Sequence, residues 1–488
     1  MNSSTPPKVD VTGLADLRAL LEQGKVIESV VHDSRLATPG SLYACLRGDH
    51  FDGHDFAADA VRSGAVALLV DHRLDELDAE GRTIAQIVVD DTRLRLGPIA
   101  AELAEHPSRS LATVGITGTN GKTTTAALMA AIFEAAGRPC GVVGTLSGPR
   151  TTPEAPELQA ALAGFVADGR TAAVLEVSSH ALAMHRVDGT AFDAVVFTNL
   201  GHDHLDLHGT HEAYFRAKAM LFDPSFASLG VVNLDDAYGR LLADAAASDE
   251  PGREFRIVGY STTELSGVDV TAGAHRYVWR GHQVHVPLGG DFNVSNSLAA
   301  LTAAVELGID ADVAIAGLGA SAPVPGRFEV IDSVESARRE IAVVVDYAHT
   351  PDGLERVIAA ARSVVGPGGS VVVVFGCGGD RDRAKRPAMG RVAAAAADRV
   401  IVTSDNPRSE PPEQIIDEIL SGVGPSSRGD IAVVVDRREA IRTAIEGASS
   451  GDVVVIAGKG HEATQEFADH TTDFDDRAVA LEFLEAPA

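Results

Sequence analysis

The sequence predicts an α/β protein of about three domains with mostly parallel sheets. Its 488 residues exceed one ordinary core, since a domain takes roughly 150 residues. The composition is 45% hydrophobic and only 5% aromatic, which suits packed helices and sheets rich in alanine, valine and glycine. Short apolar runs alternate with helix-compatible segments, and this alternation is typical of parallel sheets.

The first 108 residues predict a small α/β domain. Apolar runs at 41–46 and 65–70 are separated by amphipathic helical spacing. A helical stretch at 95–105 then leads through His106-Pro107-Ser108 into the next apolar strand. Because proline and serine punctuate the chain there, we place the first boundary at residue 108.

The middle section, residues 109–324, predicts a second domain with a mostly parallel sheet. Its expected strands are 111–117, 172–175, 194–197 and 230–233. Pro323, Pro325 and Gly326 then interrupt the pattern and predict a hinge or linker.

Residues 325–488 predict a second open, doubly wound sheet. Helices that open at Pro387 and Pro411 separate its strands. The expected strands are 341–345, 370–375, 400–403, 431–435 and 453–457. Ligands of such sheets bind at the carboxyl ends of the strands.

Charge and composition exclude several classes of protein. A formal charge of −28 argues against nucleic-acid binding, which needs a basic face. The first residues lack an apolar signal core, and no apolar run approaches a membrane span. Cys45, Cys140 and Cys377 are scattered, as expected in a reducing compartment. We therefore expect a cytoplasmic protein without membrane insertion, in which Cys377 is a packing residue.

A phosphate-binding loop follows the strand at 111–117. The letters GTNGKTTT precede an apolar helix at 126–136, so backbone N–H groups and the helix N-terminus can hold phosphate. Lys122 can reach the β- and γ-phosphates, and Thr123 can ligate Mg²⁺. Ile116 departs from the eight-residue pattern, and the alternative is an ordinary glycine turn. The loop comprises Gly118, Thr119, Asn120, Gly121, Lys122, Thr123 and Thr124.

Acidic and imidazole side chains follow the next two strands. Glu176 ends a buried run, where a carboxylate suits a Mg²⁺ ligand. The segment NLGHDHLDLHG begins at Asn199 and includes His204. Its residues alone leave a zinc hydrolase and simple surface solvation both open.

Taken with further motifs, the sequence closely resembles the Mur ligase family. The motifs are HDSR from His32, GTNGKTTT, TTP from Thr151, EVSSH, NLGHDHLDLHG, AKA at 217–219, DFNVSN from Asp291, PGRFE from Pro325, DYAHTPD, FGCGGDRDRAKRP, SDNPR and GKGHE. The resemblance implies an N-terminal UDP-binding domain, a central P-loop ATPase domain and a C-terminal Rossmann-like domain for the incoming amino acid.

The resemblance also implies the residues of the ATP site. Lys218 matches the family lysine that becomes carbamylated, and a carbamate would turn a cation into an anionic oxygen ligand. The implied metal ligands for Mg²⁺ are Thr123, Glu176, His204 and Lys218. The implied catalytic residues are Lys122, Glu176, His204, Lys218 and Arg327. The remaining nucleotide-binding residues are Asn293, Asn296, Arg327, Asp346 and His349.

Two further sets of residues match family positions for the other substrates. For the UDP-linked precursor they are Ser34, Thr151, Thr152, Ser178 and Arg186. For the amino acid they are Arg381, Asp405, Asn406, Pro407, Arg408, Gly458 and Glu462. Arg408 would hold the distal carboxylate of diaminopimelate in a bidentate pair, and Glu462 its distal ammonium.

The resemblance therefore implies a monomeric ATP-dependent ligase. Its substrates would be UDP-N-acetylmuramoyl-L-alanyl-D-glutamate, ATP and meso-diaminopimelate, joined through an acyl phosphate. Three alternatives remain open: use of L-lysine or another diamino acid, a folate polyglutamylating activity, and a catalytically silent nucleotide-binding scaffold.

Overall fold

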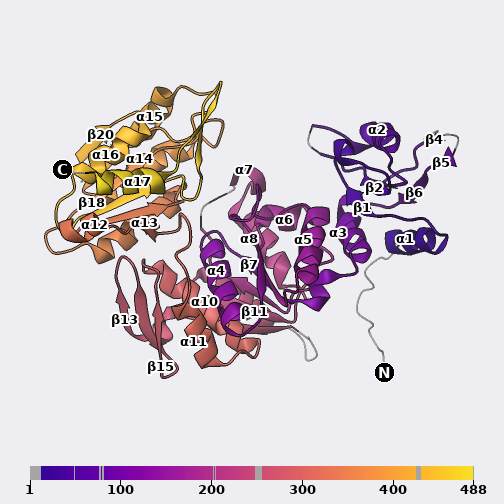
Figure 1. The fold of residues 1–488 in the computed structure, drawn as a ribbon, viewed down its shortest axis with the longest axis horizontal. Coiled ribbons are helices and arrows are strands. Elements are labelled where there is room, and N and C mark those ends of the chain that lie inside the picture. Colours follow the sequence, from indigo (N-terminus) through magenta and orange to yellow (C-terminus); the bar gives the residue numbers. More distant parts are fainter. Residues whose placement is uncertain are drawn as a thin grey trace. The chain divides into compact units, whose positions relative to one another are not determined.

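The computed structural model describes residues 12–48, 50–75, 78–79, 82–201, 203, 205–247, 255–424 and 430–486 (Figure 1). The chain divides into two compact units. One comprises residues 1–115, 138–195 and 217–228, and the other comprises residues 116–137, 196–216 and 229–488. Over the described ranges, every helix is too short or too polar to cross a membrane.

The N-terminal sheet has four parallel strands in the order β1-β2-β3-β6. They are β1 (Ser29–Val31), β2 (Ser41–Ala44), β3 (Ala67–Val70) and β6 (Ala85–Val88). Leu17 of α1 (Thr12–Glu22) and Ile99 of α3 (Thr92–Leu103) belong to the core on one face. Ala60 of α2 (Ala57–Arg62) belongs to the core on the other. Alternate strand residues therefore face opposite cores.

The central sheet has six strands in the order β12-β11-β10-β7-β9-β8. Their bounds are β7 Ala112–Thr117, β8 Cys140–Val143, β9 Ala172–Glu176, β10 Ala194–Phe197, β11 Leu229–Asn233 and β12 Arg256–Tyr260. The accompanying helices are α4 Lys122–Ala135, α5 Ala155–Ala167, α6 Ser179–Ala183, α8 His211–Ala219, α9 Ala237–Ala247, α10 Phe292–Glu306 and α11 Ala311–Gly319. The four predicted strands, which are β7, β9, β10 and β11, are confirmed, and each is followed by a helix. Strands β8 and β12 were not predicted, and β12 leads into further strands before α10.

A small antiparallel sheet, which the sequence reasoning missed, lies between β12 and α10. Its strands are β13 (Ser266–Val270), β14 (His275–Trp279) and β15 (His282–Val286). Arg280 and Gly281 connect the last two, with φ of 48° and 86°. Positive φ at both central residues is the signature of the tight hairpin turn that matches strand twist. Alternating apolar residues on either side of Arg280-Gly281 were the available signal.

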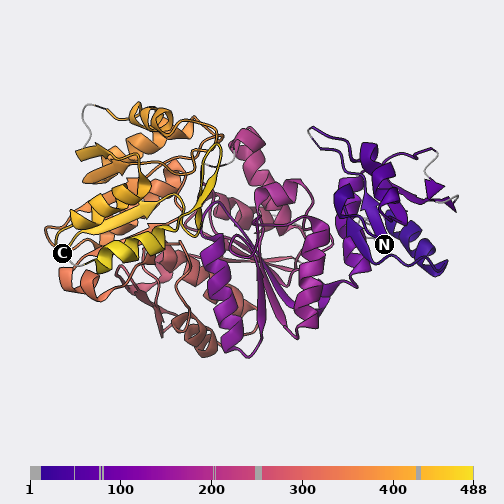
Figure 2. The same ribbon diagram turned by 45° about the horizontal axis from the view of Figure 1, so that its top comes forward.

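The C-terminal sheet has the order β16-β17-β21-β18-β19-β20, antiparallel only at β16. Its helices cover both faces (Figure 1, Figure 2): α13, α14 and α15 contribute to one core, and α16 and α17 to the other. The strands are β16 Glu329–Val330, β17 Ala342–Asp346, β18 Val371–Phe375, β19 Arg399–Val402, β20 Asp430–Val433 and β21 Val453–Ala457. The helices are α12 Val334–Arg339, α13 Pro351–Val364, α14 Lys385–Ala396, α15 Pro412–Leu420, α16 Arg437–Glu446 and α17 Asp476–Glu485. The prediction of a doubly wound sheet is confirmed.

Two predicted helix starts differ in detail. Helix α14 begins at Lys385, so Pro387 is its third residue, and α15 begins at Pro412, with Pro411 as its N-cap. All three positions lie in or before the first turn, where proline removes no intrahelical hydrogen bond. Cys377 is a packing residue, as predicted: it is buried beside Met389, and burial raises its pKa to about 12.

Candidate functional site

The phosphate loop between β7 and α4 depends on two glycines with positive φ. A Cβ at Gly118 would lie 1.9 Å from Thr198 Oγ1, and one at Gly121 would lie 2.3 Å from Asn296 Oδ1. Lys122 Nζ donates to the Gly118 and Thr119 carbonyls at 2.7 and 3.0 Å. The loop backbone therefore packs closely against neighbouring residues, and Lys122 bonds to that backbone at the start of a 14-residue helix. Phosphate binding requires this kind of glycine loop and helix N-terminus.

Two predicted asparagines of α10 lie against this loop. Asn296 Nδ2 donates to Asn293 Oδ1 at 2.8 Å, and Asn293 Nδ2 donates to the Gly289 carbonyl at 2.6 Å. Both side chains are buried, so this chain of bonds fixes the Asn296 oxygen beside Gly121. The structure thus brings Asn293 and Asn296 to the phosphate loop.

Arg327 connects the loop with the residues after β17. Its Nη2 donates to Thr123 Oγ1 at 3.3 Å, and its guanidinium lies 4.4 Å over the Tyr347 ring. Its Nε is buried without a hydrogen-bond partner in the described part of the chain, as is Nδ2 of Asn120 in the phosphate loop. Buried donors without partners point to a missing acceptor, and phosphate oxygens fit that need.

Asp346 and His349 follow β17 in the same region. The Asp346 carboxylate accepts from Phe328 N at 2.7 Å and Ala348 N at 2.8 Å, and burial raises its pKa. Burial lowers the pKa of His349, whose Nδ1 donates to the Tyr347 carbonyl at 2.8 Å. Each carboxylate oxygen of Asp346 keeps a second lone pair for a ligand hydroxyl.

Two of the predicted metal ligands, Thr123 and Glu176, offer oxygen atoms, which suit Mg²⁺. Glu176 ends β9 and is buried, and its carboxylate accepts from Thr145 N at 2.9 Å and Thr145 Oγ1 at 3.2 Å. A Cβ at Gly144 would lie 2.2 Å from Glu176 Oε1, so a glycine is needed there. Lys218, in α8, is 1% exposed. His204 lies outside the described residues.

Four of the predicted precursor-binding residues form a cluster around Thr152. The Arg186 guanidinium contacts the Thr152 carbonyl at 3.3 Å and Glu154 at 2.9 Å. Glu154 also pairs with Arg93 and Arg150, at 3.2 and 3.4 Å. Three guanidinium groups thus share one carboxylate. Burial lowers the pKa of Arg186, and within the described ranges its Nε is buried without a hydrogen-bond partner. This excess of positive charge suits an anionic ligand.

Hydroxyl groups complete the same cluster. Thr152 Oγ1 donates to the Glu176 carbonyl at 2.8 Å and accepts from Ser178 N at 3.1 Å. Thr151 Oγ1 lies 3.0 Å from Thr145 Oγ1. Ser34 begins a 3-10 turn beside the N-terminal sheet, and within the described ranges no hydrogen bond joins its side chain to the other four.

The predicted amino-acid-binding residues lie at the carboxyl ends of β18, β19 and β21. Arg408, at φ 51°, donates from Nε to Glu466 at 2.8 Å and from Nη1 to the Gly379 carbonyl at 2.9 Å. Arg408 is therefore held by two acceptors from the protein itself. Arg381 is exposed, and over the described chain no hydrogen bond joins it to this group.

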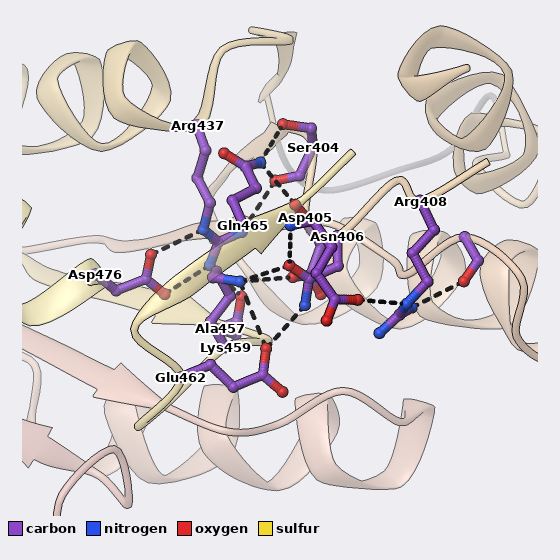
Figure 3. A network of polar contacts seen from close by, with 12 residues as sticks. Ser404, Asp405, Asn406, Arg408, Arg437, Ala457, Lys459, Glu462, Gln465 and Asp476 are labelled. Carbon is purple, nitrogen blue, oxygen red and sulfur yellow. Dashed lines mark hydrogen bonds and ion pairs between the residues drawn. The ribbon is translucent and has the colours of Figure 1, made fainter. Parts of the chain in front are cut away.

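A closed triangle of side chains lies beside Arg408 (Figure 3). Lys459 Nζ donates to Asn406 Oδ1 at 2.9 Å, Asn406 Nδ2 donates to Glu462 at 2.8 Å, and Lys459 lies 3.4 Å from the same carboxylate oxygen. Asp405 Oδ1, 3.7 Å from Lys459, is buried without a hydrogen-bond partner among the residues that the structure describes. Gly458, at φ 117°, could not carry a Cβ without close approach to Asp405.

A buried ion pair fixes the backbone beneath this triangle. Arg437 and Asp476 are both fully buried and joined by two hydrogen bonds, at 2.8 and 2.7 Å. Arg437 also donates to the Ser404 and Ala457 carbonyls, at 3.3 and 3.0 Å. It therefore ties the ends of β19 and β21 to α17 (Figure 3).

Sequence reasoning missed Lys459, Arg437, Asp476 and Glu466. Lys459 lies inside the GKGHE motif, two residues after the apolar strand β21. Its position next to a buried strand was the available signal, because a lysine there needs an acidic or polar partner. Arg437 and Asp476 come from separate helices, and their pairing has no local signature. Glu466 lies in the hairpin of β22 (Thr464–Glu466) and β23 (Thr471–Asp473), which has no distinctive sequence pattern.

In the described part of the chain, one group of side chains could hold a metal ion, and it is not the predicted one. His54, Asp71 and His72 have ligand atoms within 4.8 Å of one another. Arg47 Nε donates to Asp71 at 2.6 Å and Asp52 lies 2.5 Å from His54. This hydrogen-bonded charge network accounts for the cluster without an ion.

The fold and the phosphate loop together define a nucleotide-dependent enzyme. Residues 26–103 match the Mur ligase family, catalytic domain; residues 116–304 match the Mur ligase middle domain; and residues 326–460 match the Mur ligase, glutamate ligase domain. The chain therefore belongs to the Mur ligase family and is an ATP-dependent amide-forming ligase.

Its relatives have consistent names. The chain is 42% identical to the UDP-N-acetylmuramoyl-L-alanyl-D-glutamate–2,6-diaminopimelate ligase of Streptomyces avermitilis, over 98% of each chain. It is 42% identical to the ligase of the same name from Syntrophomonas wolfei, over 94% of each. A solved structure of a ligase with this name is 35% identical, with a TM-score of 0.65, and the match covers 94% of this chain and 95% of that one.

Proposed function

We propose that this ligase adds meso-diaminopimelate to UDP-N-acetylmuramoyl-L-alanyl-D-glutamate in the cytoplasm, with ATP as co-substrate. The observation that carries the proposal is the 42% identity, over 98% of both chains, to a ligase named for that reaction. The site is consistent with it: an arginine-rich cluster suits an anionic precursor, and the C-terminal pocket presents a cation and a carboxylate for a zwitterionic side chain.

Activation of the precursor carboxylate requires ATP, because oxide is a poor leaving group. The D-glutamate side-chain carboxylate attacks the γ-phosphorus, the bond from that phosphorus to the β,γ-bridging oxygen breaks, and ADP leaves. In this proposal Lys122 and Arg327 neutralise charge on the transferred phosphoryl group. The amine of the amino acid then attacks the acyl carbon, loses a proton, and phosphate departs as the amide forms.

Magnesium fits the predicted donor set of Thr123, Glu176, His204 and a carbamate on Lys218. When bound, Mg²⁺ would withdraw charge from the phosphate oxygens. Lys218 is buried, and a carbamate on its amine would supply an anionic oxygen ligand. Carbamylation, the monomeric state and the domain boundaries at 108 and 324 remain parts of this proposal.

The test is phosphate release by the purified protein with ATP, Mg²⁺ and the UDP-linked dipeptide. Parallel reactions contain meso-diaminopimelate, L-lysine or no amino acid, and mass spectrometry identifies the product. Release and a tripeptide product with diaminopimelate alone are expected. Release with lysine instead would contradict the assignment of Arg408, and silence with every amine would favour a catalytically silent scaffold.

A further inference from the structure

Lys459 is the least expected polar side chain in the C-terminal pocket. Its side chain is fully buried, although lysine is almost never buried unless it is paired. Its ammonium lies 2.9 Å from Asn406, 3.4 Å from Glu462 and 3.7 Å from Asp405. These are three of the seven residues predicted to bind the amino acid, so one buried cation joins several of them (Figure 3).

The hydrogen bonds of Asn406 show which groups remain for a ligand. Its Oδ1 accepts from Lys459 and from Glu466 N at 3.1 Å, and its Nδ2 donates to Glu462 Oε2. The Asn406 side chain therefore links Lys459 to Glu462 through hydrogen bonds. The other oxygen of Glu462, Oε1, has no hydrogen-bond partner within the described residues, and the side chain is 35% exposed. The triangle thus holds one oxygen of Glu462 and leaves the other open.

The charges lead to the same conclusion. Arg437 is neutralised by Asp476, and Arg408 by Glu466. Lys459 then offsets one of the two remaining carboxylates, Asp405 and Glu462. Around Lys459, one negative charge therefore remains, and it complements a single ammonium group.

We propose that Lys459 is a positioning residue that sets the specificity of this pocket: through Asn406 it orients Glu462 toward the distal ammonium of the amino-acid substrate. The inference rests on the proposed function, because it assumes a diamino acid as substrate. Lys459 touches no reacting atom in this proposal, and its effect is confined to selection of the amino acid.

The test compares meso-diaminopimelate with L-2-aminopimelate, which keeps the reacting amino group and both carboxylates but lacks the distal ammonium. The measured quantity is the ratio of kcat/KM for the two amino acids. Lys459→Met should lower this ratio by about 10- to 100-fold, the range expected when hydrogen bonds to a charged group are lost. The KM for ATP should stay within about twofold, because the phosphate loop is untouched. Lys25→Met, at an exposed lysine, is the matched control and should leave the ratio unchanged.

The outcomes distinguish a failure of the proposed function from a failure of the role of Lys459. A wild-type enzyme that is inactive with diaminopimelate would overturn the proposed function. An active wild type with an unchanged ratio in Lys459→Met, or with equal losses for both amino acids, would overturn only the role of Lys459. Where Lys459→Met does not fold by circular dichroism, Asn406→Ala decides. It opens two sides of the triangle and keeps the ammonium, so the ratio must fall in this variant as well.

Discussion

Removal of one partner from the Arg437–Asp476 pair should destabilise the C-terminal domain strongly. Both side chains are 0% exposed, so Asp476→Ala leaves a buried guanidinium whose remaining acceptors, among the described residues, are the Ser404 and Ala457 carbonyls. Breaking a buried pair in this way costs about 3–5 kcal/mol. Because each 1.4 kcal/mol is a factor of ten, opening of the sheet should become at least roughly 100-fold more frequent.

The chain offers a matched control one residue away. Arg438 of α16 pairs with Glu482 of α17, but these side chains are 46% and 57% exposed. Glu482→Ala removes the same kind of charge from the same helix pair. Since exposed pairs contribute about 0.2–1 kcal/mol, the effect should stay below roughly fivefold.

Hydrogen–deuterium exchange by mass spectrometry resolves the effect for each domain, which unfolding of a whole multidomain chain does not. Peptides that cover β21 should exchange at least roughly 100-fold faster in Asp476→Ala, while those from the N-terminal sheet should be unchanged. Equal exchange of β21 in Asp476→Ala and Glu482→Ala would refute the reasoning.

Three other predictions follow from the site and the fold. Gly121→Ala should raise the Kd for ATP by about tenfold, because left-handed backbone costs alanine about 1–2 kcal/mol and the new Cβ meets Asn296. The control Gly137→Ala, at a glycine with positive φ but open space around it, should leave the Kd unchanged. Equal affinities of the two variants for ATP by calorimetry would contradict this prediction. Arg408→Ala should raise the KM for diaminopimelate at least about tenfold with little change for ATP, and equal losses would remove Arg408 from the pocket. Burial lowers the pKa of His275 to about 4, so the unfolded chain binds a proton below about pH 6.5 while the folded chain does not. The contribution of neutral His275 to the stability of the β13–β15 sheet should therefore be fully present above about pH 6.5 and decrease toward pH 4. In His275→Gln, hydrogen exchange of this sheet should no longer show that loss of stability. The same loss in the variant would contradict the prediction.

The sequence predicted the four inner strands of the central sheet because their signal is local, and it did not predict the edge strands β8 and β12. Strands buried on both faces appear as continuous apolar runs, as at β10 and β21, whose predicted bounds match the structure. The β14–β15 hairpin was missed because the alternation of strands and helices predicts parallel sheets, in which two strands are not joined by a two-residue turn such as Arg280-Gly281. Its antiparallel strands have one polar face, a weaker pattern in a window of five residues.

The site was predictable only where a backbone requirement leaves a motif. Gly118 and Gly121 are forced by positive φ and close approach, so the phosphate loop is visible in the sequence. The partners of Arg408 are not, because Glu466 and Gly379 come from segments whose proximity is set by the sheet order. Such pairings depend on tertiary contacts, and no short-range pattern encodes them.

The buried Arg437 also bears on how acceptor specificity can change in evolution. Arg437 donates hydrogen bonds to two main-chain carbonyls, those of Ser404 and Ala457. Any residue at those two positions would present the same carbonyl group. Side chains in the loops beyond can therefore be exchanged while the anchor persists, and these loops contribute little to the two hydrophobic cores of the sheet. New substrates can thus be selected without a new fold, so long as the arginine and its aspartate are inherited together.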